Sequence, residues 1–206
     1  MELLLLSNSR SPDGSYLSHA LGAISAIAGA RRRALFLPFA SVTVGWDDFT
    51  AKVQGAIAAT GIALDPIHAA PDPLGAVAAA AMIFVVGGNT FNLLAECRRR
   101  GLLAPIASRV RAGTPYVGWS AGSVLACPTI GTTNNMPIVD PSGFAALGLV
   151  DFQVNVIGRR FVIWIGSHQS DNRNQRRVIE IVQENVLSGL PFFPSENCDA
   201  SVFGRN

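Results

Sequence analysis

Pro115-Tyr116-Val117-Gly118-Trp119-Ser120-Ala121-Gly122 is the stretch of this 206-residue sequence that decides the fold. An apolar run enters it, a glycine-bounded turn follows, and an apolar helical pattern begins at its end. The turn has the form G-x-S-x-G in the order strand, turn, helix, which is typical of a nucleophilic serine held at the end of a buried strand. A serine in such a strained turn brings neighbouring backbone close, so the pattern requires glycine at positions 118 and 122.

Four apolar runs precede this one, and helical patterns separate them. We expect strands at Leu3–Ser7, Ala34–Phe39, Ile62–Ile67, Met82–Val86 and Pro115–Trp119. We expect helices at Tyr16–Ala30, Trp46–Thr60, Pro73–Ala80 and Thr90–Arg111, the last broken near Gly101. Alternation of strand and helix is typical of a parallel sheet with helices on both faces. The predicted fold class is therefore α/β, a doubly wound, mostly parallel sheet.

The pattern weakens after Asp151. Phe152–Ile157 and Phe161–Ile165 are predicted as strands, and Asn172–Leu187 as an amphipathic helix. Residues 191–206 carry two prolines and little periodicity, so we expect a loosely held tail there. No repeat or linker divides the sequence, and residues 1–206 are predicted to form one domain.

Composition narrows the possible functions. With 49% hydrophobic and 15% charged residues the chain is globular, and at this length it can bury about 70% of its unfolded surface without disulfides or metal. The net charge of +2 predicts no nucleic-acid partner, and no apolar run reaches the ~18 residues of a membrane span. Three widely spaced cysteines without a C-x-x-C pattern predict reduced thiols in a cytoplasmic protein, and no metal site.

Lys52 is the only lysine, and its sequence setting is that of an ordinary helix surface. A P-loop, a pyridoxal phosphate enzyme and a Ser-Lys dyad each need a lysine in a specific setting. The sequence therefore excludes these chemistries, and we expect no cofactor.

A second glycine-rich turn, Gly87-Gly88-Asn89-Thr90, follows the fourth predicted strand. In an open parallel sheet, reactive groups collect beyond the carboxyl ends of the strands. A nucleophilic serine needs N–H donors for the developing oxyanion, and Ala121 and Gly88 can supply them. The alternative is a plain turn in which Asn89 or Thr90 caps the next helix.

Six segments of the chain together resemble the S51 family of serine peptidases. These segments are Met1–Ser9, Ala34–Ala40, Gly87–Phe91, Gly101–Pro105, Gly118–Gly122 and Thr132–Pro141, and the resemblance covers about residues 1–155. It implies a fold like that of class I glutamine amidotransferases and a cytoplasmic enzyme, monomer or homodimer, that hydrolyses dipeptides with an N-terminal aspartate. It also implies that Ser120 is the nucleophile and that Gly88 and Ala121 form the oxyanion hole.

The sequence departs from this family at two positions of the catalytic triad. Asn135 stands where the family has aspartate, and Ile157 stands where it has histidine. Isoleucine can neither accept the serine proton nor return it to the leaving amine, so the usual general base is missing. We therefore expect little or no hydrolysis by this chain.

The remaining candidates for the catalytic base and for substrate binding are a histidine and an arginine. His19 and His68 are expected to be surface or packing residues, which leaves His168 as a substitute base, although it also resembles a Gly-His pair outside the family's triad. Arg173 matches a family arginine suited to the substrate carboxylate.

Two other functions stay open at this point. One is an inactive pseudo-peptidase that keeps the fold and the ligand pocket. The other is an unrelated acyl hydrolase of the α/β-hydrolase class, which shares the G-x-S-x-G turn.

Overall fold

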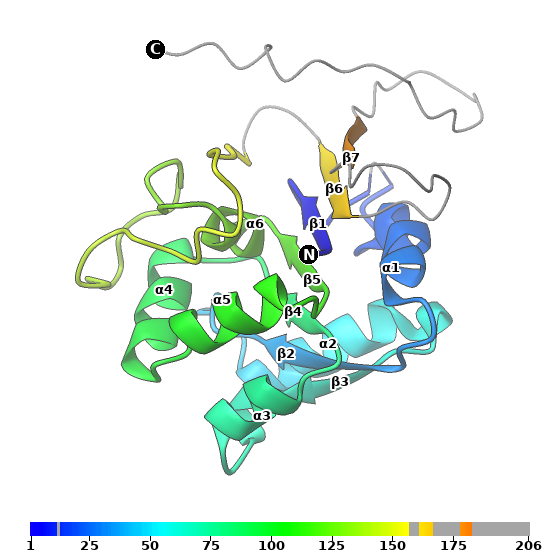
Figure 1. Cartoon of the computed structure of the whole chain (residues 1–206), viewed down its shortest axis with the longest axis horizontal. Helices are drawn as coiled ribbons and strands as arrows, with labels where there is room; N and C mark the ends of the chain where they lie inside the picture. The colour runs from blue at the N-terminus through cyan, green and yellow to red at the C-terminus, as the bar shows by residue number, and fades with distance from the viewer. Residues whose placement is uncertain (12, 157–160, 167–177, 183–206) are drawn as a thin grey trace.

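One seven-stranded sheet organises the structure, a computed structural model that describes residues 1–11, 13–156, 161–166 and 178–182 (Figure 1). The strand order is β3-β2-β4-β5-β1-β6-β7. The five parallel strands are β1 (Leu3–Leu6), β2 (Arg33–Leu37), β3 (Ala63–Pro66), β4 (Ile83–Val85) and β5 (Tyr116–Trp119). The antiparallel edge consists of β6 (Val162–Gly166) and β7 (Val178–Val182).

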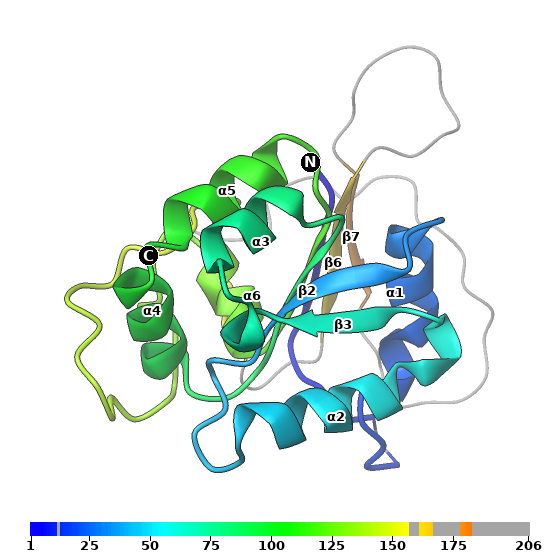
Figure 2. The same cartoon turned by 90° about the horizontal axis from the view of Figure 1, so that it is seen from below.

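Helices connect the parallel strands and cover both faces of the sheet. They are α1 (Leu21–Ala28), α2 (Trp46–Ala56), α3 (Pro73–Ala79), α4 (Thr90–Arg99), α5 (Leu103–Arg111) and α6 (Ala121–Ala126), with short 3₁₀ turns at Ser18–Ala20, Ala58–Thr60 and Ile67–Ala69. Figure 2 shows α1 and α2 on one side of the sheet and α3 and α5 on the other. The predicted doubly wound, mostly parallel α/β class is therefore confirmed.

The central strands form the middle of the core. All four leucines of β1 and all three residues of β4 are fully buried. Strands covered on both faces are continuously apolar rather than alternating, which is why the sequence showed them as unbroken apolar runs. The predicted break near Gly101 is also confirmed, because Gly101 has a φ of +66° between α4 and α5.

At the antiparallel edge the sequence prediction is confirmed only for β6, which was expected as a strand at Phe161–Ile165. Residues 152–156 form no strand, and Val178–Val182 is β7 rather than part of the predicted helix 172–187. Four of the five residues of β7 are valine or isoleucine, which favour strands, and pairing with β6 outweighs the helical pattern. The tail 191–206 lies outside the described residues.

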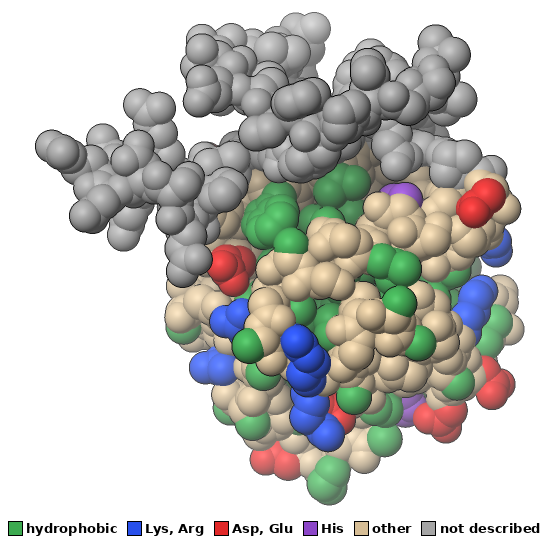
Figure 3. Space-filling model, turned by 90° about the vertical axis from the view of Figure 1, so that its right-hand side faces the viewer, with side chains coloured by type: hydrophobic (Ala, Val, Ile, Leu, Met, Phe, Trp, Pro, Cys, Tyr) green, Lys and Arg blue, Asp and Glu red, His purple; other side chains and the backbone are tan. Residues whose placement is uncertain are grey.

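Charged side chains are mixed in sign on the face shown in Figure 3, the side of the molecule on which α1 lies in Figure 1. Basic and acidic groups are interspersed there among polar and apolar ones. One of the basic groups at the start of β2, Arg33, pairs with Asp65 of β3. No described helix is long and apolar enough to cross a membrane.

Candidate active site

The two glycine-rich turns lie side by side. β4 and β5 are parallel neighbours in which Val85 pairs with Gly118, so the turns that follow them leave the sheet at the same edge. A Cβ placed on Gly87 would stand only 2.9 Å from the Cβ of Ser120. The structure therefore brings Ser120 and the Gly87–Gly88 turn into direct contact.

Ser120 has a strained backbone between β5 and α6. Its φ of 50° and ψ of −113° lie outside the regions that residues with side chains ordinarily adopt. The N–H of Ser120 donates to the Leu6 carbonyl at 2.9 Å, and its own carbonyl accepts from Ser123 and Val124 at the start of α6. The Oγ, on a partly exposed residue, has no hydrogen bond to any described residue. A serine hydroxyl is thus presented at the end of a strand by a backbone that is fixed on both sides.

The glycines of the turn are required by close packing. A Cβ on Gly122 would stand 2.2 Å from the Val85 carbonyl oxygen, and a Cβ on Gly118 would stand 2.7 Å from the Gly122 carbonyl oxygen. Real side chains do not approach backbone so closely, because the overlap would push β4, β5 and α6 apart. The close approach that the sequence predicts at these two positions is confirmed.

Two buried hydroxyl groups stabilise the turn by hydrogen bonds to backbone carbonyls. Tyr116 donates to the Gly122 carbonyl at 2.7 Å, and Ser123 donates to the carbonyls of Gly118 and Leu6 at 2.9 and 2.8 Å. Burial raises the pKa of Tyr116 well above its usual value, so its phenol stays a neutral donor. Neither residue is a candidate on sequence grounds, although their places two before and five after Gly118 in the strand-turn-helix pattern are the signal that would find them.

The buried thiols near this turn are unreactive. Burial raises the pKa of Cys127 to about 11 and that of Cys97 to about 12. A thiol is nucleophilic only as the thiolate, so neither cysteine competes with Ser120 for the role of nucleophile near neutral pH.

Two backbone N–H groups at this edge are available as donors. Those of Gly88 and Ala121 make no hydrogen bond to a described residue. Gly88 has a φ of +143°, and a Cβ there would stand 2.2 Å from the Ala40 carbonyl oxygen, so only glycine fits. Asn89 meanwhile caps α4, since its Oδ1 accepts from the Asn92 N–H at 3.0 Å. The turn thus caps a helix, as the alternative interpretation expects, and also carries one of the two available donors.

Asn135, in the loop after α6, lies against the first residue of α4. Its Oδ1 accepts three hydrogen bonds, from the Thr90 N–H at 2.9 Å, from the Thr90 Oγ1 at 2.7 Å and from the Thr133 Oγ1 at 3.1 Å. No hydrogen bond joins Asn135 to Ser120. The expected triad position is therefore occupied by a side chain whose oxygen binds the helix that follows the glycine-rich turn.

Sequence comparison assigns the chain to a family. Residues 3–193 match peptidase family S51. The chain belongs to this family. It is 50% identical over 194 residues to peptidase E of Citrobacter koseri and 48% identical to peptidase E of Escherichia coli O6:K15:H31, in each case over 93% of this chain and 83% of the relative. The chain is thus a member of a peptidase family, and the α/β-hydrolase alternative has no support from these matches.

Structural comparison agrees on the fold. A crystal structure of a Listeria monocytogenes EGD-e protein assigned to peptidase E superposes with a TM-score of 0.65 at 21% identity, over 88% of this chain and 98% of that one. A peptidase from an acI-B1 actinobacterium gives a TM-score of 0.52 at 15% identity, over 73% and 65%. At these identities the likeness concerns the fold alone, and it agrees with the predicted α/β class with a mostly parallel sheet.

Ile157, His168 and Arg173 lie outside the described ranges. His19 contacts Ser11 at 3.0 Å, and His68 contacts Asp47 at 2.8 Å. Within residues 1–11, 13–156, 161–166 and 178–182 no cluster of three or more His, Cys, Asp or Glu side chains is arranged to bind a metal ion.

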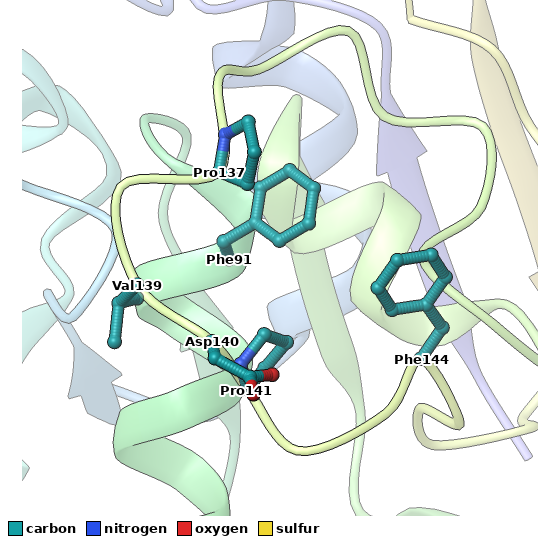
Figure 4. Close-up of a pocket in the computed structure, with 6 residues that line it drawn as sticks. All are labelled: Phe91, Pro137, Val139, Asp140, Pro141 and Phe144. Carbon is teal, nitrogen blue, oxygen red and sulfur yellow. The ribbon is translucent and has the colours of Figure 1, made fainter.

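A mainly apolar cavity of about 300 Å³ lies between α4 and the segment that follows Asn135 (Figure 4). Phe91 of α4 and Phe144 line it and meet edge to face, with their ring centroids 5.9 Å apart, and residues of the 137–141 segment complete its wall. Phe144 of the loop therefore packs against Phe91 of α4, although it stays half-exposed.

Proposed function

We propose that this S51 chain has the site of a serine-type dipeptidase for dipeptides with an N-terminal aspartate. Ser120 is the nucleophile in this proposal, and the N–H groups of Gly88 and Ala121 bind the oxyanion. The observation that carries it is the strained backbone of Ser120 in contact with the Gly87–Gly88 turn. Strain of this kind is retained where it serves a function, and here it presents the hydroxyl beside two unpartnered donors.

The acylation step needs a general base, and no described residue is hydrogen-bonded to the Ser120 hydroxyl to act as one. Ser120 Oγ attacks the peptide carbonyl carbon, the carbonyl oxygen takes the negative charge, and the serine proton must pass to the leaving amine. Ile157 stands at the family's histidine position and can carry no proton. Loss of the base of such a triad typically lowers the rate by several powers of ten. Hydrolysis by the unaltered chain is therefore expected to be very slow.

The direct test compares hydrolysis of Asp-Leu by four proteins: the unaltered chain, Ser120→Ala, Ile157→His and the double variant. We expect the unaltered chain to match Ser120→Ala, because both lack a working nucleophile-base pair. Ile157→His should raise the rate at least a hundredfold, and Ser120→Ala should abolish that gain. Fast turnover by the unaltered chain that Ser120→Ala abolishes would contradict the missing base, and His168→Ala would then show whether His168 replaces it.

The pseudo-peptidase is the second candidate, and Ile157 is the observation that favours it. It predicts that Asp-Xaa dipeptides bind without turnover, with Arg173 as the partner of the substrate carboxylate. Calorimetric titration with Asp-Leu should then give the same affinity for the unaltered chain and Ser120→Ala, and at least tenfold weaker binding for Arg173→Ala. We also propose a cytoplasmic location, a monomer or homodimer, and a small peptide as substrate, with no nucleic-acid or membrane partner.

A further inference from the structure

Four side-chain hydrogen bonds join the segment 133–136 to the residues that follow the Gly87–Gly88 turn. Asn135 Oδ1 accepts two of them from Thr90, and Thr133 Oγ1, whose one proton is shared with Asn135 Oδ1, donates a third to Thr90 Oγ1 at 2.9 Å. Asn89 Nδ2 donates the fourth to the Met136 carbonyl at 2.9 Å. The two ends of this connection lie about 45 residues apart in the chain, so only these bonds and the local packing fix their relative position.

The donors on Thr90 and Asn89 are deeply buried, while the Asn135 side chain is not. Thr90 is 1% exposed and Asn89 is 8% exposed, whereas Asn135 is exposed. A buried N–H and a buried hydroxyl without an acceptor are costly, so the position of Thr90 depends on the Asn135 oxygen. Thr90 is the second residue after Gly88, and Asn89 between them donates its N–H to the Ala40 carbonyl at 2.8 Å. Any movement of Thr90 is therefore passed to the turn.

We propose that Asn135 is a positioning residue that fixes the Gly87–Gly88 turn relative to Ser120, rather than the partner of a catalytic imidazole. Its role as an aid to catalysis rests on the proposed function, but its hold on the turn does not. Only the side-chain oxygen takes part in the three bonds, and the Nδ2 makes no hydrogen bond to a described residue. An aspartate at this position would offer the same oxygen to the same donors.

The test measures hydrogen exchange of single amides in the unaltered chain, Asn135→Ala, Asn135→Asp and Asn134→Ala. The reporter is the Asn89 amide, which bonds to Ala40 and not to Asn135, so loss of one local bond does not by itself expose it. We expect exchange at Asn89 to be about tenfold faster in Asn135→Ala and unchanged in the other two variants. The Ser120 amide, bonded to Leu6, should keep its exchange rate in every variant.

A second readout reports on Ser120 itself. A fluorophosphonate reagent forms a bond between Ser120 Oγ and phosphorus, and fluoride leaves together with the serine proton. In the Ile157→His background, Asn135→Ala should slow this labelling about tenfold, while Asn135→Asp should restore it. Ser120→Ala in the same background sets the unlabelled baseline.

The two readouts separate the two proposals. Unchanged exchange at Asn89 in Asn135→Ala would overturn the positioning role, whatever the labelling shows. Faster exchange at Asn89 without labelling of Ser120 in any protein would leave the positioning of the turn standing and would overturn the proposed nucleophile. Faster exchange at Asn89 and Ser120 alike would mean general destabilisation and would also overturn the specific role.

Discussion

The turn around Ser120 and the loop 132–145 lie at the same end of the molecule but are held by different forces. The Ser120 turn is fixed by backbone packed so tightly that no side chain fits at Gly118 or Gly122. The loop is fixed by side chains, chiefly Asn135 and Arg98, and it leaves several of its apolar residues exposed, including Met136 at 79% and Phe144 at 52%. Close backbone packing requires glycine at fixed positions, which can be recognised in the sequence. A loop held by a few side-chain hydrogen bonds shows no such pattern.

The largest expected effect comes from breaking the steric fit. Gly122→Ala places a Cβ 2.2 Å from the Val85 carbonyl oxygen, and the strand or the helix must move to accept it. We expect a loss of roughly 3 kcal/mol or more in the free energy of unfolding, measured by urea denaturation.

Gly55→Ala is the matched control for this variant. Gly55 also lies in a helix, but a Cβ there meets nothing within 4 Å. Alanine should stabilise this helix by roughly 0.5–1 kcal/mol. Equal effects of the two substitutions would mean that close packing does not fix the Ser120 turn.

The sequence predicts the tightly packed part of the molecule well. The five parallel strands are apolar runs bounded by turns, and the strand-turn-helix pattern at Ser120 depends only on neighbours in the chain. The features that it misses depend on distant contacts. β7 forms because β6 pairs with it, and the Asn135 oxygen binds Thr90, 45 residues earlier. Nothing local to Asn135 distinguishes it from any loop asparagine, and the resemblance to S51 peptidases suggested a different role for it.

The second prediction concerns the side-chain anchors of the loop. Arg98 of α4 donates to the carbonyls of Pro141, Ser142 and Ala145, the bonds to Pro141 and Ala145 measuring 2.6 and 2.8 Å. Arg98→Ala removes all three bonds at once. We expect a loss of about 2 kcal/mol in the free energy of unfolding and faster proteolysis within residues 137–145.

Arg99→Ala serves as the control, because Arg99 is an exposed neighbour whose described partner is Glu96. The unfolding midpoint should not change for this variant, since solvent screens an exposed ion pair. If Arg98→Ala left the midpoint and the proteolysis pattern equally unchanged, the loop would be held by its apolar contacts with Phe91 instead.

The smallest expected change in the free energy of unfolding comes from substitutions of Ser120 itself. With a φ of 50° and a ψ of −113°, Ser120 holds strain that a glycine would not feel. Ser120→Gly should therefore stabilise the protein by roughly 1 kcal/mol, since release of strain exceeds the extra entropy that glycine adds to the unfolded chain. Ser120→Ala keeps the Cβ and hence the strain, so its free energy of unfolding should match that of the unaltered chain. Both variants lose the hydroxyl, and thermal unfolding of the pair isolates the backbone contribution. A Ser120→Gly protein less stable than Ser120→Ala would mean that the turn is relaxed, and the main structural argument for a nucleophile at this position would be lost.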